Sequence, residues 1–138
     1  TALVLLTDKP LPQGQSGPTI TLTDVDVQSY ESDLAQKQST ARVEVGEQLT
    51  EQQLLQGMLI PSANNLAETA ARWDAGSVAS FVARMNARAI SLGMTHTRFA
   101  DVSGAREGDQ QEGGEGEGVM FSSRPAAHTA ASQILKSI

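Results

Sequence analysis

The stretch TEQQLLQGMLIPSANNLA, residues 50–67, carries the strongest local structure signals in this sequence. Thr50 followed three residues later by Gln53 is a capping box, in which a threonine caps a helix start and a glutamine bonds back to it. Four apolar side chains then fall on one helical stripe: Leu54, Leu55, Met58 and Leu59. Pro61 ends the helix, because the residue before a proline is pushed out of the helical region. We therefore predict a helix between Thr50 and Pro61 that buries one face.

Two further helices are predicted close behind this one. An alanine-rich segment over about residues 65–73 favours a short helix. Ser77 then caps a longer helix, whose apolar positions repeat at three- and four-residue spacing until Gly93 supplies the residue past its end. Three helices joined by short connections indicate a small helical lobe.

The chain before this lobe mixes helix, loop and strand signals. The apolar run at 2–6 resembles the end of an element whose beginning is missing, and three prolines and two glycines in 9–18 predict a loop. Asp24 is expected to cap a helix that runs to about Gln38. Alternating apolar and polar residues predict two short strands: 19–23 and 41–45.

Composition excludes several classes of function. The 138 residues carry a net charge of −6, which argues against a nucleic-acid partner because such proteins need a basic surface. Cysteine is absent, so disulfides, thiolate catalysis and cysteine-based zinc sites are excluded. His96 and His128 have no acidic residue at ligand spacing, so we expect no metal site and no cofactor. We expect Trp73 to pack within the helical lobe.

Residues 105–138 differ in composition from the part before them. The segment 104–118 reads GAREGDQQEGGEGEG and holds half of the chain's 12 glycines, together with five carboxylates. Such a sequence buries too little apolar surface to offset the entropy lost on ordering. We therefore predict that the folded domain covers residues 1–104 and that 105–138 form an acidic linker and tail.

The turn after the first of the three helices contains the two residues best suited to a catalytic or binding role, Ser62 and Asn64. A hydroxyl can relay a proton and a carboxamide can both donate and accept hydrogen bonds, so the two side chains can serve one cleft. Serine and asparagine are also common helix caps, and on the Ser-x-Asn tripeptide alone capping is the favoured interpretation. The flanking sequence shifts the balance toward a site.

The flanks of Ser62 and Asn64 resemble the serine-type D-alanyl-D-alanine carboxypeptidases, which are low-molecular-weight penicillin-binding proteins. The resemblance covers roughly residues 1–104. It is carried by four blocks that keep the family's order: 46–67, 81–86 (FVARMN), 92–99 (LGMTHTRF) and 101–104 (DVSG).

The resemblance implies an α/β fold of the β-lactamase/transpeptidase type, with a helical lobe beside an antiparallel sheet and the active site between them. Three motifs meet there in the family: Ser-x-x-Lys with the nucleophile and its base, Ser-x-Asn, and Lys-Thr-Gly. By this resemblance Ser62 passes a proton toward the leaving D-alanine and Asn64 holds the substrate's amide, whereas Asn65 is expected to be a helix cap. The implied ligands are the D-Ala-D-Ala ends of peptidoglycan stem peptides, and β-lactams.

The sequence departs from the family at both ends. Neither Ser-x-x-Lys nor Lys-Thr-Gly occurs in the 138 residues, and Lys136 is followed by serine and isoleucine. Residues 1–6 resemble the stretch just after Ser-x-x-Lys-x-Met in relatives, so a truncated or frame-shifted gene would explain both ends. We expect an incomplete fold, mainly the helical lobe with two short strands. Because a covalent mechanism needs a nucleophile with its base in reach, we expect this chain alone to be inactive.

The favoured function is that of a serine-type D-Ala-D-Ala carboxypeptidase. Two alternatives stay open: a non-catalytic helical fragment or binding module, and a β-lactamase-like hydrolase, although class A β-lactamases carry Ser-Asp-Asn where this chain has Ser62-Ala63-Asn64. Relatives are exported to the cell envelope, whereas this sequence has no signal peptide and no apolar run of about 20 residues. Without a covering sheet, exposed apolar helix faces are expected to favour self-association.

Overall fold

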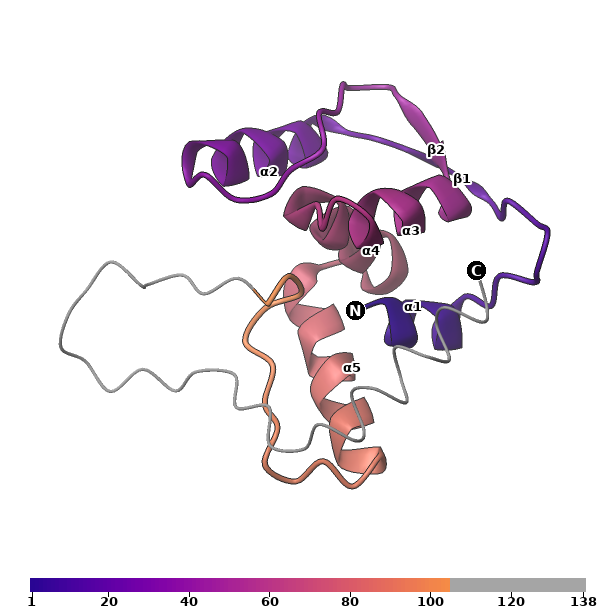
Figure 1. Cartoon of the computed structure of the whole chain (residues 1–138), viewed down its shortest axis with the longest axis vertical. Helices are drawn as coiled ribbons and strands as arrows, with labels where there is room; N and C mark the ends of the chain where they lie inside the picture. Colours follow the sequence, from indigo (N-terminus) through magenta and orange to yellow (C-terminus); the bar gives the residue numbers. More distant parts are fainter. Residues whose placement is uncertain (105–138) are drawn as a thin grey trace, which may run out of the picture.

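The computed structural model describes residues 1–104, which contain five helices and a two-stranded sheet (Figure 1). The helices are α1 (Ala2–Asp8), α2 (Asp24–Ala35), α3 (Glu51–Leu59), α4 (Asn64–Ala75) and α5 (Val78–Ser91). Strands β1 (Thr19–Thr21) and β2 (Gln48–Thr50) pair antiparallel, with Ile20 opposite Leu49. The predicted linker and tail, 105–138, lie outside the described residues.

Helix α4 is the central element. It packs against α1, α2, α3 and α5, with α2 on one side and α1 and α5 on the other (Figure 1). The alanine-rich sequence explains this position, since Ala67, Ala70 and Ala71 are at most 4% exposed. Small side chains let neighbouring helices approach closely, because the distance between helix axes depends on the residues at the contact. The core therefore gathers around α4.

The three predicted helices of the lobe are confirmed as α3, α4 and α5. The capping box at the start of α3 is formed: the Thr50 hydroxyl accepts from the Gln53 N–H at 3.2 Å, and the Gln53 side chain accepts from the Thr50 N–H at 2.9 Å. Ser77 caps α5 by accepting from the Ser80 N–H at 3.1 Å. Gly93 follows α5 at φ 75°, as its position past the helix end predicts.

The strand predicted at residues 41–45 is wrong. Val43 is buried between exposed neighbours, so the alternation is real, but the segment is irregular and β2 is the strand that pairs with β1. The main chain of Ala41 bonds instead to the side chain of Asn65. The alternation thus reflects one buried side chain, and the backbone pairs with an asparagine side chain instead of a neighbouring strand.

Three element ends also differ from the prediction. Thr23 rather than Asp24 caps α2, because the Asp26 carboxylate accepts from the Thr23 N–H at 2.8 Å and closes a capping box. The helix ends at Ala35, short of Gln38, and Lys37 then adopts a left-handed φ of 57°. The apolar run at 2–6 lies within α1. Among residues 1–104, no helix is both long and apolar enough to cross a membrane.

Candidate active site

The turn between α3 and α4 holds both predicted site residues. Ser62 is exposed and adopts φ 56°, a left-handed conformation that is strained for any residue with a Cβ. Ala63 is extended and only 1% exposed, so its methyl points into the core. The turn therefore buries Ala63 and leaves Ser62 exposed and Asn64 half-buried.

Asn64 is held by the segment that follows α2. Its Nδ2 donates to Gln38 Oε1 at 2.7 Å, and its backbone N–H donates to the Ser39 carbonyl at 2.8 Å. The Ser39 hydroxyl in turn donates to the Pro61 carbonyl at 2.6 Å. Gln38 and Ser39 could not be identified from the sequence, because two polar residues after a helix carry no local signal of this contact.

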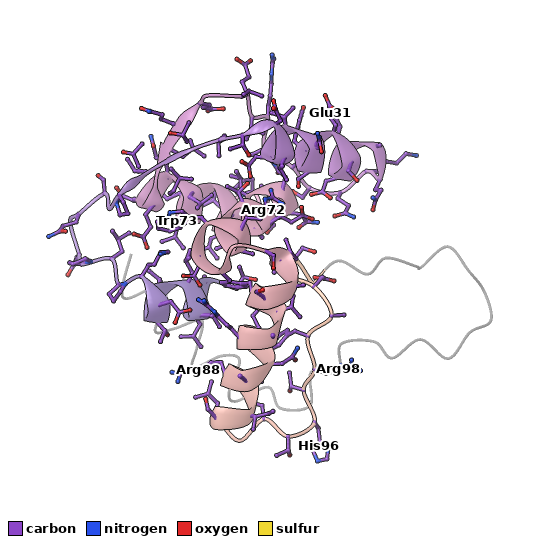
Figure 2. The ribbon with its side chains drawn as sticks, turned by 180° about the vertical axis from the view of Figure 1, so that it is seen from behind. Glu31, Arg72, Trp73, Arg88, His96 and Arg98 are labelled. Atoms are coloured by element: carbon purple, nitrogen blue, oxygen red, sulfur yellow. The ribbon has the colours of Figure 1, made fainter. Side chains whose placement is uncertain are left out.

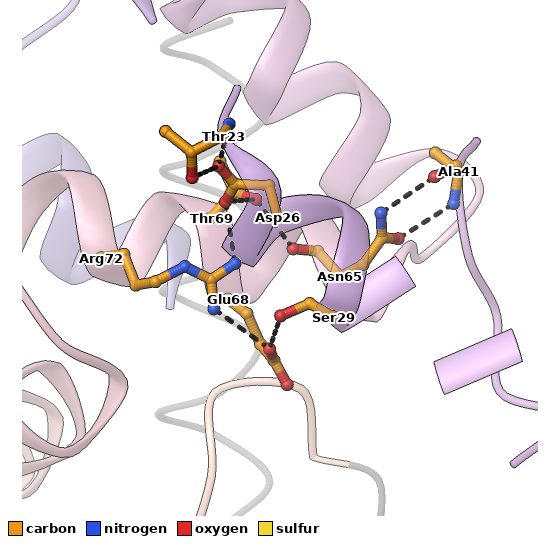
Figure 3. Close-up of polar contacts among 8 residues, drawn as sticks. All are labelled: Thr23, Asp26, Ser29, Ala41, Asn65, Glu68, Thr69 and Arg72. Carbon is orange, nitrogen blue, oxygen red and sulfur yellow. Dashed lines mark hydrogen bonds and ion pairs between the residues drawn. The ribbon is translucent and has the colours of Figure 1, made fainter. Parts of the chain in front are cut away.

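Asn65 has a structural role that differs from the one expected of it. Ala63 is the N-cap of α4, so Asn65 does not cap the helix. Its side chain is 0% exposed and spans the Ala41 peptide groups, accepting from the Ala41 N–H at 3.0 Å and donating to the Ala41 carbonyl at 2.9 Å (Figure 3). Two consecutive asparagines therefore fix the chain 38–41 against the start of α4.

Ser62 has no activating partner among residues 1–104, since its hydroxyl forms no hydrogen bond there. Lys9 lies 4.7 Å from the Trp73 ring and 3.8 Å from Asp74 Oδ1, so its ammonium is engaged elsewhere. Lys136 lies outside the described residues. The turn can donate and accept hydrogen bonds, but within the described residues no base is hydrogen-bonded to the Ser62 hydroxyl, as an activated nucleophile requires.

A partly buried charge network joins α2 to α4 (Figure 3). Arg72 donates to Asp26 Oδ1 at 2.8 Å and to Glu68 Oε2 at 3.3 Å, and the Thr69 hydroxyl donates to Asp26 Oδ1 at 2.8 Å. Burial alone would raise the pKa of Asp26, but hydrogen bonds from Arg72, Thr23 and Thr69 outweigh it and hold that pKa below its ordinary value. Asp26 therefore stays ionised and holds α2 in place.

The pKa values of three other carboxyl groups are shifted in the opposite direction, upward. Burial raises the pKa of Asp33, Glu51 and Asp74 above their ordinary values. The neighbouring Glu68 adds to the effect at Asp33, whereas Lys9 opposes it at Glu51. These three groups accept no hydrogen bond from Ser62 or Asn64, so within the described chain they lie outside the candidate site.

The other residues singled out in the sequence take structural or exposed positions. Trp73 packs against the core, as predicted. His96 is exposed in the segment after α5 (Figure 2), and His128 lies outside the described residues. Residues 1–104 contain no group of three or more side chains suited to a metal ion. An open groove of about 360 Å³ between α1 and α5 is lined by Val4, Thr7, Asp8, Arg84, Ala87, Arg88 and Ser91, and so does not include Ser62 or Asn64.

Comparison with solved structures identifies proteins that share this architecture. The Streptomyces K15 DD-transpeptidase superposes with a TM-score of 0.64 at 28% identity, over 78% of this chain and 41% of that one. A D-alanyl-D-alanine carboxypeptidase from Mycobacterium tuberculosis H37Rv gives a TM-score of 0.57 at 32% identity, over 75% of this chain and 36% of that one. The predicted fold class, a partial lobe of the α/β transpeptidase fold, is confirmed.

Sequence comparison agrees with the structural one. A D-alanyl-D-alanine carboxypeptidase of Streptomyces sp. (strain K15) is 36% identical over an alignment of 92 residues that covers 61% of this chain and 32% of that protein. The D-alanyl-D-alanine carboxypeptidase DacF of Bacillus subtilis (strain 168) is 35% identical over 65 residues, 47% of this chain and 17% of that protein. This chain therefore spans about a third, or less, of the length of these relatives.

The family itself is matched over most of the sequence. The sequence model of the D-alanyl-D-alanine carboxypeptidase family matches residues 14–136. The match continues past residue 104, so the domain boundary placed there stays a prediction. The resemblance stated from the blocks around Ser62 and Asn64 is confirmed at the level of the family. This chain belongs to the D-alanyl-D-alanine carboxypeptidase family.

Proposed function

We propose that this chain supplies the Ser-x-Asn corner of a serine-type D-Ala-D-Ala carboxypeptidase, with Ser62 relaying a proton and Asn64 binding an amide of the peptide. One observation carries the proposal: the α3–α4 turn holds an exposed serine in a strained φ of 56° beside an asparagine whose carboxamide is fixed. Strain that persists on a rigid scaffold is typical of functional positions. The substrates are peptides ending in D-Ala-D-Ala, and the inhibitors are β-lactams.

The chain alone is proposed to bind rather than to cleave. Its 138 residues contain no Ser-x-x-Lys and no Lys-Thr-Gly, and within residues 1–104 no base is hydrogen-bonded to Ser62. A serine without a base is a weak nucleophile at neutral pH. Intact-mass spectrometry after incubation with penicillin is therefore expected to show an unchanged mass, and a penicilloyl adduct would contradict the proposal.

The roles of Ser62 and Asn64 are tested by restoring the missing motifs. Residues 14–104 replace the matching region of the Streptomyces K15 carboxypeptidase, which supplies the rest of the fold. Ser62→Ala in this chimera is expected to lower the rate of D-alanine release about 10²–10⁴-fold, the usual contribution of a positioned proton-transfer group. Asn64→Ala is expected to lower kcat/KM, and Ser91→Ala, at the far end of α5, is the matched control. Unchanged rates in both site variants would overturn the proposal.

Two further properties are proposed from family membership and surface composition. Since the family acts on peptidoglycan, we place the working protein at the cell envelope. Four large apolar side chains are at least 40% exposed on α3 and α5 and directly after them: Leu59, Ile60, Ile90 and Leu92. Such faces favour self-association, which sedimentation velocity over a concentration series would detect.

A further inference from the structure

A chain of side-chain amides runs from α2 to the candidate site. Gln36 Nε2 donates to the Ser32 hydroxyl at 3.3 Å, Gln38 Nε2 donates to Gln36 Oε1 at 2.8 Å, and Asn64 Nδ2 donates to Gln38 Oε1 at 2.7 Å. Every link points the same way, with a nitrogen donating toward α2 and an oxygen accepting from the site side. Hydrogen bonds aligned head to tail polarise and strengthen one another.

This polarity determines which way the Asn64 carboxamide faces. A carboxamide has two donor hydrogens on one side and an acceptor oxygen on the other, and the two sides exchange when the group turns over. Gln36 Oε1 accepts from the nitrogen of Gln38, so Gln38 presents its oxygen to Asn64. Asn64 donates its nitrogen to that oxygen, and within residues 1–104 its Oδ1 and second N–H have no hydrogen-bond partner and can meet another molecule.

The row of amides is anchored on α2, which the partly buried charge network ties to α4. The Gln38 N–H donates to the Asp33 carbonyl at 2.9 Å, which ties the segment after α2 back to its last turn. Asp26, near the other end of α2, is bonded to Arg72 of α4 at 2.8 Å. The Gln38 side chain is thus fixed by α2, whereas Asn64 is fixed by Gln38.

We propose that Gln38 is a positioning residue for ligand binding: it sets the orientation of the Asn64 carboxamide so that its oxygen and one N–H face a peptide amide. The inference rests on the proposed function, because it assumes that Asn64 binds the D-Ala-D-Ala peptide. A peptide amide offers one N–H and one carbonyl, which match the free acceptor and donor of Asn64. Fixing the carboxamide beforehand removes the entropy lost when a mobile side chain is ordered on binding.

The test uses the full 138-residue chain labelled with ¹⁵N and a short peptide ending in D-Ala-D-Ala. Gln38→Leu removes the acceptor at similar size, Gln38→Glu keeps an acceptor oxygen, and Gln28→Leu, at an exposed position of α2, is the matched control. In Gln38→Leu the side-chain amide signal of Asn64 is expected to move and to show fast internal motion. Peptide affinity is expected to fall about three- to tenfold, as expected for one newly mobile side chain. Gln38→Glu restores both.

The outcomes separate this inference from the function on which it rests. If wild type binds the peptide and Gln38→Leu binds equally well with an unmoved Asn64 signal, the inference is overturned and the function stands. If wild type does not bind, the proposed function fails, and the Asn64 signal still decides whether Gln38 orients the carboxamide. Should Gln38→Leu fail to fold, Gln36→Leu removes the next link at an exposed position and must shift the Asn64 signal in the same direction.

Discussion

Asn65 closes both hydrogen bonds of the Ala41 main chain with one side chain, at 3.0 Å to the N–H and 2.9 Å to the carbonyl. We expect Asn65→Ala to lower the free energy of unfolding by about 2–3 kcal/mol, because two partly buried backbone groups lose their partners. Urea denaturation measures the loss, and hydrogen exchange of the Ala41 amide locates it.

Asn86 provides a matched control for this prediction. Its side chain bonds to both main-chain groups of Phe99, at 2.7 Å to the N–H and 2.9 Å to the carbonyl. Asn86→Ala is therefore expected to destabilise the chain to a similar extent while the Ala41 amide keeps its protection. If the Ala41 amide were as well protected in Asn65→Ala as in wild type, the Asn65 side chain would not be what holds residue 41.

The buried pair between Asp26 and Arg72 is expected to matter far more than an exposed one. Asp26→Asn should cost about 2–3 kcal/mol, near the low end for a broken buried pair, because Arg72 keeps Glu68 as a partner. In the pair Arg42–Glu44 both side chains are more than 70% exposed, so Glu44→Gln should change stability by about 0.5 kcal/mol or less.

Acid gives this prediction a second readout. Since the folded pKa of Asp26 lies below its ordinary value of 3.8, its stabilisation is complete above that value and is lost as the pH falls through the lowered pKa. The difference between wild type and Asp26→Asn should therefore be full at neutral pH and shrink in strong acid. Urea midpoints measured across this range check it, and a difference that is independent of pH would contradict the role of the carboxylate charge.

The parts of the fold that the sequence predicts are those with local causes. The capping box of α3 needs only Thr50 and Gln53, three residues apart, and both of its hydrogen bonds are formed. The strand prediction for residues 41–45 failed because the hydrogen-bond partner of this backbone, Asn65, lies 24 residues away along the chain. Alternation reports which side chains are buried, and it does not report what the backbone bonds to.

The same distinction applies to the candidate site. Ser62 and Asn64 are found from a motif and its flanks, which are contiguous in the sequence. Gln38 lies 26 residues from Asn64 and follows a helix end that the sequence placed at about Gln38 instead of Ala35. A residue predicted at a helix end offers no reason to expect its side chain in the site, so the support of the motif becomes visible only in the folded chain.

Glu51 is a buried carboxylate whose neutral replacement should stabilise the chain. It is 1% exposed, and its Oε1 has no hydrogen-bond partner in the described structure. At the start of α3 its charge gains about 0.3–1 kcal/mol from the helix dipole. Burying an unpaired charge costs more than burying an unpaired neutral group, for which the penalty is about 1–3 kcal/mol, and glutamine keeps the polar atoms but carries no charge. Glu51→Gln is therefore expected to stabilise the chain at neutral pH by about 1–2 kcal/mol.

The pH dependence of this gain has a definite sign. Burial raises the pKa of Glu51 above its ordinary 4.5, so the folded chain holds the proton more tightly and wild-type stability falls as the pH rises from 4.5 through the raised pKa. The advantage of Glu51→Gln should grow over that window and vanish in acid, as thermal unfolding can show. Glu31→Gln, at an exposed position of α2 (Figure 2), should show no such change.

Ser62→Gly is expected to make the chain more stable while removing the hydroxyl proposed to relay a proton. The left-handed φ of 56° costs a residue with a Cβ about 1–2 kcal/mol, and glycine adopts it freely. Glycine also raises the conformational entropy of the unfolded chain, which offsets about 0.4–1 kcal/mol of that gain in stability. The net gain should be about 0.5–1 kcal/mol, measured by urea denaturation.

Two controls separate backbone strain from loss of the serine side chain. Ser62→Ala removes the hydroxyl and keeps the Cβ, so it should show no gain. Lys37→Gly relieves the same conformation at φ 57°, in the segment after α2 rather than in the turn itself, and should gain a similar amount. If Ser62→Gly proves no more stable than Ser62→Ala while Lys37→Gly is stabilised, the α3–α4 turn relaxes without strain at Ser62. The backbone argument for a functional serine would then be lost, because strain would mark only the end of α2.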